Sequence, residues 1–274
     1  FLLMPCFMDD AFSTKLVTVY PDNQRHKLPA TMAAVVLNDM LTGQPLALLN
    51  GTYLTGMRTG AVGGVSVKYL ARRDAARLGV VGAGTQGLFQ VLAAAAVRPI
   101  TDVYIFDNYP AMLESYAARL LAKRPDLNVH PVASADEAAA NADVIIVCST
   151  ATQPVFSDDA ALFAGKHIVA IGSYQPHTRE LPRTALSNAA GIWLDTMYAA
   201  EESGDIAIPI AEGWLQRQRP QPFCDLVQAG AAPQGMADAQ TVFKSVGIGL
   251  FDLMAAKKIY HKALQENFGQ TVDL

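Results

Sequence analysis

The sequence is poor in cysteine and has no long uninterrupted apolar run. Its three cysteines, Cys6, Cys148 and Cys224, are far apart and odd in number, which excludes a disulfide framework and a metal-binding cysteine motif. Such cysteine usage is typical of a reducing compartment, so we expect a cytoplasmic protein. No apolar segment approaches the ~18 residues that a membrane-spanning helix needs, so we expect no membrane partner.

Charged residues are also scarce, at 17% of the 274 residues, compared with ~25% in an average protein. Hydrophobic residues make up 51%, which excludes intrinsic disorder and predicts a well-buried globular protein. The net charge is −4, without a basic block, so we expect no nucleic-acid partner. An acidic stretch at Glu201, Glu202 and Asp205 has no histidine nearby, and we expect no metal site.

The first segment of the chain predicts strands, turns and then one helix. Residues 1–8 are apolar but lack the basic flank and cleavage site of a signal peptide. The chain does not begin with Met, so we expect the native protein to start upstream. Residues 31–38 and 45–49 predict two strands around a turn. We expect Thr55 to cap a helix that runs to Leu70.

The middle of the chain alternates short, fully apolar strands with helices. The expected strands are residues 78–81, 103–106, 144–147, 168–171 and 192–194, and the expected helices are 89–97 and 111–123. Apolar strands separated by helices indicate a parallel sheet covered on both faces. Residues 211–239 predict a loop excursion, and residues 240–265 predict a final helix.

These patterns predict an α/β fold with two domains. A Rossmann-type, doubly wound parallel sheet at residues 76–239 would be inserted in a discontinuous α+β domain. Residues 1–75 and 240–274 would form that second domain, which we expect to bind substrate.

The most specific chemical motif is a glycine-rich turn between a strand and a helix. It consists of Gly82, Ala83, Gly84, Thr85, Gln86 and Gly87. In such a turn the first glycine permits the tight bend, the second lets backbone approach a pyrophosphate, and the third allows close helix packing. We expect residues 82–86 to bind a dinucleotide at the positive N-terminus of the helix. A turn that serves packing alone is the alternative.

An acid at the end of the next strand favours NAD(H) over NADP(H). Asp107 follows the strand at residues 103–106, where a carboxylate accepts hydrogen bonds from the adenosine ribose hydroxyls. Its charge repels a 2′-phosphate, and neither Asn108 nor Tyr109 compensates. The sequence therefore favours NAD(H) and leaves NADP(H) open; Asp107 as a turn residue is the alternative.

Three further strings become informative beside this turn. They are Leu54–Thr55–Gly56–Met57–Arg58–Thr59–Gly60–Ala61, Ile171–Gly172–Ser173–Tyr174–Gln175–Pro176 and Val242–Phe243–Lys244–Ser245–Val246–Gly247. Together with the glycine turn, and in this order, they resemble the ornithine cyclodeaminase/mu-crystallin family over nearly the whole chain.

The resemblance implies a homodimeric enzyme that uses a nicotinamide cofactor at the C–N bond of an α-amino or α-imino acid. Members include ornithine cyclodeaminases, alanine dehydrogenases and reductases of cyclic ketimines. Mu-crystallin also belongs to the family, which keeps a non-catalytic nucleotide- or ligand-binding role open. Opine-type or alanine dehydrogenation, with an open-chain imine, is a further alternative.

Tyr174 separates this chain from the ornithine cyclodeaminases. Those enzymes and the similar alanine dehydrogenases carry a catalytic Asp where this sequence has Tyr174. A phenol is a poor base at neutral pH and cannot pair with an amine. The motif instead resembles that of the cyclic-ketimine reductases. We therefore expect reduction of 1-pyrroline-2-carboxylate or 1-piperideine-2-carboxylate to proline or pipecolate.

Two cations are the expected catalytic and substrate-binding residues. Arg58 lies on an apolar helix, where a guanidinium needs an anionic partner, and the resemblance places it at the substrate carboxylate and near the cofactor. Lys15 alternates with apolar residues as on a strand, and the family has a functional Lys in a matching string. An ordinary surface role is the alternative for each.

Other motif residues complete the expected site. For the cofactor we expect contacts from Thr59, Ser149, Thr150 and Ile171, of which Ser149 and Thr150 end a strand at the edge where ligands bind open α/β sheets. For the substrate we expect Ser173, Lys244 and Ser245, the last two in the first turns of the final helix.

Overall fold

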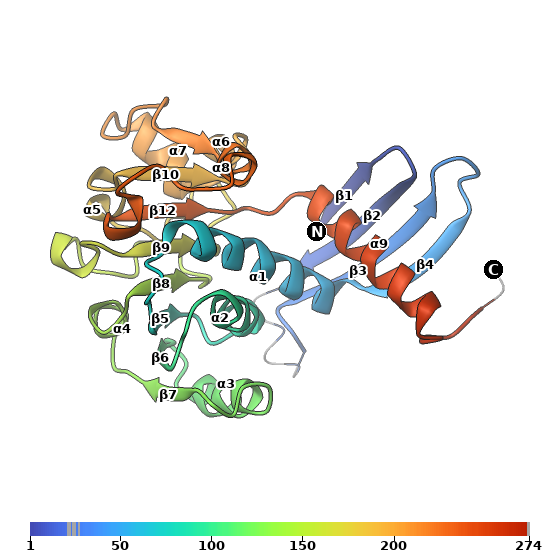
Figure 1. Cartoon of the computed structure of the whole chain (residues 1–274), viewed down its shortest axis with the longest axis horizontal. Helices are drawn as coiled ribbons and strands as arrows, with labels where there is room; N and C mark the ends of the chain where they lie inside the picture. Colours follow the sequence, from blue (N-terminus) through green and yellow to red (C-terminus); the bar gives the residue numbers. More distant parts are fainter. Residues whose placement is uncertain (21–22, 24–25, 27, 273–274) are drawn as a thin grey trace. The chain divides into compact units, whose positions relative to one another are not determined.

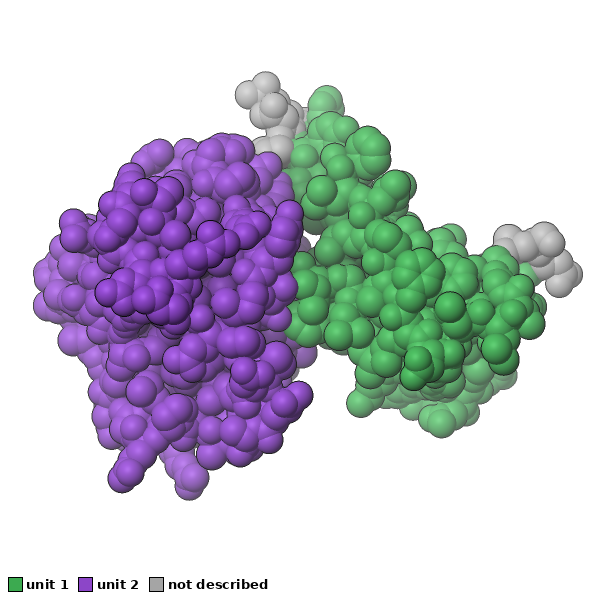
Figure 2. Space-filling model, turned by 90° about the horizontal axis from the view of Figure 1, so that it is seen from above, with its two compact units in different colours: residues 1–58, 247–274 green, residues 59–246 purple. Residues whose placement is uncertain are grey.

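The computed structural model describes residues 1–20, 23, 26 and 28–272. The chain forms two compact units, which Figure 2 shows in different colours. Unit 1 comprises Phe1–Arg58 and Gly247–Leu274, and unit 2 comprises Thr59–Val246. The expected α/β class, with a parallel sheet inserted between two segments of a second unit, is confirmed.

Unit 1 is a four-stranded antiparallel sheet with one long helix on it (Figure 1). Its strands are β1 (Leu2–Phe7), β2 (Ala11–Val19), β3 (Thr31–Asp39) and β4 (Pro45–Asn50), and the helix is α9 (Gly249–Gln265). Along β2, alternate side chains from Ala11 to Val17 are buried, because α9 packs on this face of the sheet. Ser13 and Lys15 belong to the same buried row.

Unit 2 is built on an eight-stranded parallel sheet in the order β11-β10-β12-β9-β8-β5-β6-β7. The strands are β5 (Arg77–Val81), β6 (Asp102–Phe106), β7 (Asn128–Pro131), β8 (Val144–Val147), β9 (His167–Ala170), β10 (Gly191–Leu194), β11 (Pro220–Pro222) and β12 (Thr241–Lys244). Strands β8, β9, β10 and β12 are buried throughout. Because these strands run parallel, their carboxyl ends lie along one edge of the sheet. Parallel α/β sheets bind their ligands at this edge.

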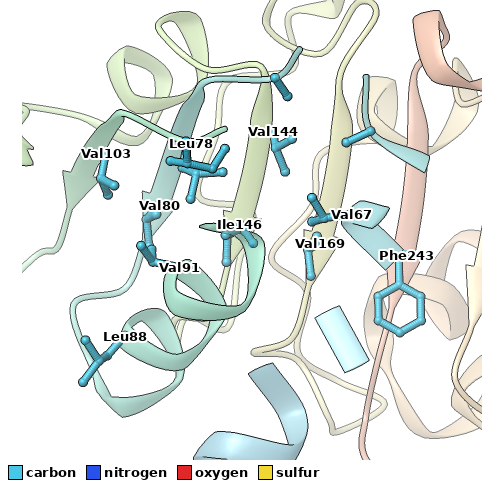
Figure 3. Close-up of a cluster of buried hydrophobic side chains, with 14 of the residues drawn as sticks. Val67, Leu78, Val80, Leu88, Val91, Val103, Val144, Ile146, Val169 and Phe243 are labelled. Atoms are coloured by element: carbon cyan, nitrogen blue, oxygen red, sulfur yellow. The ribbon is translucent and has the colours of Figure 1, made fainter. Parts of the chain in front are cut away.

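Helices cover both faces of the parallel sheet. They are α1 (Gly51–Leu70), α2 (Thr85–Val97), α3 (Ala111–Leu121), α4 (Ala135–Ala140), α5 (Arg183–Ser187), α6 (Ala199–Glu202), α7 (Gly204–Ala211) and α8 (Phe223–Ala229), with short 3₁₀ turns η2 (Ala160–Leu162) and η3 (Met236–Asp238). Figure 3 shows one core, in which Val80 and Ile146 of the sheet lie with Val91 of α2. The second core includes α4, α5 and α7.

The prediction of a helix from residue 240 is wrong. Residues Thr241–Lys244 form β12, which pairs with β9 and β10 in the middle of the sheet, and α9 begins only at Gly249. The apolar spacing that suggested a helix fits a short buried strand equally well. The compact units accordingly divide at 58/59 and 246/247, not at the predicted 75/76 and 239/240.

Two smaller expectations also differ from the structure. Helix α1 begins at Gly51, so Thr55 lies inside it and does not cap it. Residues 211–239, expected as loop, contain β11 and α8. Among the described residues, no helix combines the length and apolarity that crossing a bilayer requires.

Candidate functional site

The glycine turn has the geometry that its sequence predicts. Gly82 has a φ of +111°, and a Cβ on it would lie 2.6 Å from the carbonyl oxygen of Cys148. A Cβ on Gly87 would lie 2.2 Å from the carbonyl oxygen of Gly82. Both positions therefore need glycine, one for its conformation and one for the close packing of α2 on the turn.

The same turn leaves room for an anion at the start of α2. A Cβ on Gly84 would meet no atom within 4 Å, and no side chain caps the helix there. The Oε1 atom of Gln86, in the first turn, is buried without a hydrogen-bond partner in the described chain, which is rare for a buried polar atom. Thr85 is exposed beside it. The open N-terminus of α2 at Gly84 fits a bound dinucleotide pyrophosphate, which needs N–H donors. The Gln86 oxygen is an acceptor and fits a donor group of a ligand instead.

Asp107 holds the glycine turn in place. Its Oδ2 atom accepts a hydrogen bond from the backbone N–H of Ala83 at 2.8 Å, and its Oδ1 atom accepts one from Tyr109 at 2.9 Å. Each carboxylate oxygen can accept a further bond, so a contact with ribose remains a prediction. Arg119 of α3, which sequence reasoning did not include, donates from Nη2 to the carbonyl oxygen of Ala83 at 3.3 Å.

A buried carboxylate, Glu180, ties the ends of two neighbouring strands together. Its Oε1 atom accepts from the backbone N–H and the hydroxyl of Ser149, after β8, at 2.8 and 2.7 Å. Its Oε2 atom accepts from the backbone N–H of Ser173, after β9, at 2.9 Å. The Ser173 hydroxyl is itself buried and donates to the carbonyl oxygen of Thr178. Glu180 thereby fixes the two loops that follow β8 and β9.

Glu180 belongs to a buried charge cluster with Asp205 and Lys244, all 0% exposed. Asp205 accepts the backbone N–H of Glu180 at Oδ1 and pairs with Lys244 Nζ through Oδ2 at 3.0 Å. Burial, and then the nearby Asp205, raise the pKa of Glu180 to about 7, against the attraction of Lys244. We call these three residues the unit 2 cluster.

The side chains of Lys244 and Ser245 are buried on internal partners. Lys244 binds Asp205, and the Ser245 hydroxyl donates to Asp195 Oδ2 at 2.6 Å. Lys244 is the last residue of β12 and Ser245 follows it directly, so their predicted placement in the first turns of a helix is wrong. We therefore assign no substrate contact to the Lys244 ammonium.

The remaining predicted cofactor residues lie at different depths in unit 2. Thr59 is 5% exposed, and its carbonyl oxygen accepts from Gln90 Nε2 at 3.1 Å. Thr150, beyond β8, is exposed, and Ile171, beyond β9, is half-buried. Contacts of these residues with a cofactor remain predictions.

In unit 1, a buried aspartate brings the two predicted catalytic cations together. Asp252 of α9 pairs with Lys15 Nζ of β2 through Oδ2 at 2.6 Å. Its Oδ1 atom accepts from Nε of Arg58, on α1, at 2.9 Å. Lys15 is 2% exposed, Arg58 8% and Asp252 0%. These three residues, the unit 1 cluster, carry one net positive charge.

Burial makes the Lys15 ammonium easier to deprotonate. The pKa of Lys15 is lowered to about 8, first by desolvation and then by Arg58, while Asp252 opposes the shift. At neutral pH the amine therefore still holds its proton. Two buried hydroxyl oxygens of the same unit, those of Ser13 and Thr55, have no hydrogen-bond partner in the described chain. Such groups favour a polar ligand.

Sequence reasoning missed the three carboxylates that organise these clusters. Asp252 lies on the buried face of α9 with Leu253 and Ala256, whereas Leu250 and Met254 are exposed. The apolar spacing of this helix therefore did not show that the carboxylate is buried. Glu180 lies four residues after the string that ends at Pro176, and Asp205 belongs to the acidic stretch. Neither segment shows which carboxylate is buried.

The parallel sheet and its glycine turn define the Rossmann class of folds. A family model described as the ornithine cyclodeaminase/mu-crystallin family matches residues 1–267. The chain therefore belongs to this family.

Three relatives illustrate the similarity. A Delta(1)-pyrroline-2-carboxylate reductase of Bacillus cereus is 36% identical over 99% of this chain and 84% of its own length. The Thermococcus litoralis Delta(1)-pyrroline-2-carboxylate reductase, solved in complex with NADH and L-proline, has a TM-score of 0.90 and 32% identity over 99% of this chain and 88% of that one. An archaeal alanine dehydrogenase dimer with bound NAD has a TM-score of 0.87 and 29% identity, over 99% and 83%.

Proposed function

We propose that this protein is an oxidoreductase that reduces a small cyclic imino acid with NADH. The substrate is 1-pyrroline-2-carboxylate or 1-piperideine-2-carboxylate, and the product is proline or pipecolate. The C=N bond gains a hydride at carbon and a proton at nitrogen, while the reduced nicotinamide is oxidised. The pairing of Lys15 and Arg58 on Asp252 carries this proposal, because it provides a buried cationic site for one carboxylate.

Arg58 and Lys15 hold the substrate carboxylate. A guanidinium presents paired N–H donors that match a carboxylate. Within the unit 1 cluster, Asp252 accepts its hydrogen bond from Nε of Arg58. Lys15 adds an ammonium that, with a pKa lowered to about 8 by burial, is protonated at neutral pH. This ammonium can bind the carboxylate or donate a hydrogen bond near the imine nitrogen. Both contacts orient the substrate and reduce the entropic cost of reaction.

The glycine turn of unit 2 holds the cofactor. Gly82 offers the tight turn, and Gly84 offers the open helix N-terminus for the pyrophosphate. Asp107 favours NAD(H), since its carboxylate disfavours a 2′-phosphate. The similarity to reductases and dehydrogenases solved with NADH or NAD supports the same choice. When bound, the cofactor supplies the hydride.

The test is a spectrophotometric assay of the whole chain. Loss of reduced-nicotinamide absorbance is followed with 1-pyrroline-2-carboxylate and with 1-piperideine-2-carboxylate, first with NADH and then with NADPH. We expect oxidation of NADH with at least one imine. The parallel control is ornithine with NAD, followed by ammonia release. Ammonia release without imine reduction would replace the proposal by a cyclodeaminase and would refute the inference from Tyr174.

We also propose a homodimer that uses the open face of the unit 1 sheet. The face opposite α9 carries Leu3, Phe7, Leu16 and Leu48, exposed by 59%, 63%, 46% and 76%. Contiguous exposed apolar surface favours a protein interface, and the similar alanine dehydrogenase is a dimer. Sedimentation of the wild type and of L16K/L48K tests this: we expect a dimer and a monomer, respectively. A monomeric wild type would contradict the assignment.

We also propose that the protein is located in the cytoplasm. Cys6, Cys148 and Cys224 are free thiols, as is typical of a reducing compartment. Fractionation with an antibody against the chain tests this, and recovery in an extracellular or membrane fraction would contradict it.

A further inference from the structure

Asp252 lies outside the motif strings given above, and it binds both cations of the unit 1 cluster. It lies on α9 and is 0% exposed. Its two carboxylate oxygens are divided between two cations from different elements, Lys15 at 2.6 Å and Arg58 at 2.9 Å. A carboxylate placed in this way fixes the distance between an ammonium and a guanidinium that would otherwise repel each other.

We propose that Asp252 is a positioning residue for the reduction, acting through Lys15 and Arg58. The inference rests on the proposed function, in which these cations hold the substrate carboxylate. By binding Arg58 at Nε, Asp252 orients the guanidinium through a hydrogen bond that does not use its terminal nitrogens. By binding Lys15 Nζ, it keeps the ammonium at a defined point and favours its protonated form.

Asp252 is the negative charge that opposes the effects of burial and of Arg58 on the pKa of Lys15. Among the described residues, the charges that act on Lys15 are Arg58 and Asp252. The neighbouring strands contribute only a thiol, Cys6 on β1, and an acid at the end of β3, Asp39, which binds Thr42. The other ionisable groups of α9 are Lys257, Lys258, Tyr260, His261 and Lys262. Lys257 pairs with the exposed Asp10.

The test compares D252N with a matched control, D10N. Both variants neutralise one aspartate that binds a lysine of unit 1. Asp10, however, is 63% exposed and pairs with Lys257, which is not a candidate catalytic residue. Steady-state kinetics with 1-pyrroline-2-carboxylate and NADH are measured from pH 6 to 10, and folding is checked by circular dichroism. Because all proteins are assayed with the same imine, its own titration contributes equally to every pH profile, and differences between the profiles come from the protein.

For D252N we expect KM for the imine to rise about tenfold or more, with a smaller change in KM for NADH. The upper apparent pKa of kcat/KM should fall by about one unit or more, because the carboxylate that favours the Lys15 ammonium is gone. D10N should match the wild type in both respects. A folded D252N with wild-type KM and an unshifted pH profile would overturn the inference.

A second variant keeps the inference testable if D252N does not fold. D252E retains the charge but moves the carboxylate by one methylene group. We expect it to raise KM for the imine about fivefold while leaving the upper apparent pKa in place. A folded D252E with unchanged KM would overturn the positioning role. Failure of the proposed function is distinct, because then the wild type itself would oxidise no NADH with either imine.

Discussion

Each of the two units buries one cluster of opposite charges, and the two clusters differ in composition and in partners. The unit 1 cluster has two cations, Lys15 and Arg58, on one carboxylate. The unit 2 cluster has two carboxylates, Glu180 and Asp205, with one cation. In unit 2, backbone N–H groups take up most of the carboxylate oxygens. An excess of cations suits an anionic ligand, whereas acids bonded to backbone fix loops.

The largest expected effect comes from removing the one cation of the unit 2 cluster. K244M leaves Asp205 and Glu180 buried without a positive charge, and breaking a buried pair in this way typically costs about 3–5 kcal/mol. Urea unfolding should therefore show a severe loss of stability. If K244M kept wild-type stability and lost substrate affinity instead, Lys244 would be a ligand residue and the contrast between the clusters would fail.

In the unit 1 cluster, loss of a cation should impair binding more than folding. R58A removes the guanidinium fork from the substrate carboxylate, so we expect KM for the imine to rise about 100-fold. R217A is the matched control, because Arg217 is 71% exposed and binds Glu201 at the surface. An R58A protein with wild-type KM would exclude Arg58 from the substrate site.

The two clusters should respond to pH with opposite signs. Glu180 has its pKa raised from 4.5 to about 7 by burial, so the folded state holds the extra proton and stability falls as pH rises through this range. Lys15 has its pKa lowered from 10.5 to about 8, so the unfolded state holds the extra proton and stability rises with pH above about 8. Each slope is at most about 1.4 kcal/mol per pH unit.

Urea unfolding at a series of pH values checks these signs. E180Q should remove the fall between pH 4.5 and 7, and K15M should remove the rise between pH 8 and 10.5. Identical pH dependence in wild type and variant would show that the group in question does not titrate as its burial implies.

The smallest expected effect concerns the cofactor. D107S removes a carboxylate that disfavours a 2′-phosphate, so KM for NADPH should fall while KM for NADH rises, each by about tenfold. Arg119, which already contacts the carbonyl oxygen of Ala83, offers a cation near the turn. D126S, at an exposed acid paired with Arg124, should leave both constants unchanged. An unaltered cofactor preference in D107S would assign Asp107 to the turn alone.

The sequence was most informative where the structure is local. Strand, glycine turn, helix and following acid lie within residues 78–107, and each residue type is required by the conformation of its own neighbourhood. The structure confirms this through the positive φ of Gly82 and the close packing at Gly87. The parallel sheet was predicted from a different signal, because fully apolar strands separated by helices indicate burial on both faces without showing which strands pair.

It was least informative where the decisive contacts join distant segments. Phe243, Val246 and Leu250 have helical spacing, yet the first of them lies on a strand whose neighbours, β9 and β10, come from elsewhere in the chain. All of unit 2 separates Asp252 from Lys15 and Arg58 in the sequence. Periodicity reports local structure, and it carries no record of such long-range pairs.

The central claim is that the unit 1 cluster recognises a substrate carboxylate. The most direct measurement compares NADH oxidation by the wild type with 1-pyrroline-2-carboxylate and with 2-methyl-1-pyrroline, in which a methyl group replaces the carboxylate. We predict that kcat/KM is about 1000-fold or more higher for the carboxylate, and that R58A removes most of this difference. Equal kcat/KM for the two imines in the wild type would contradict the claim.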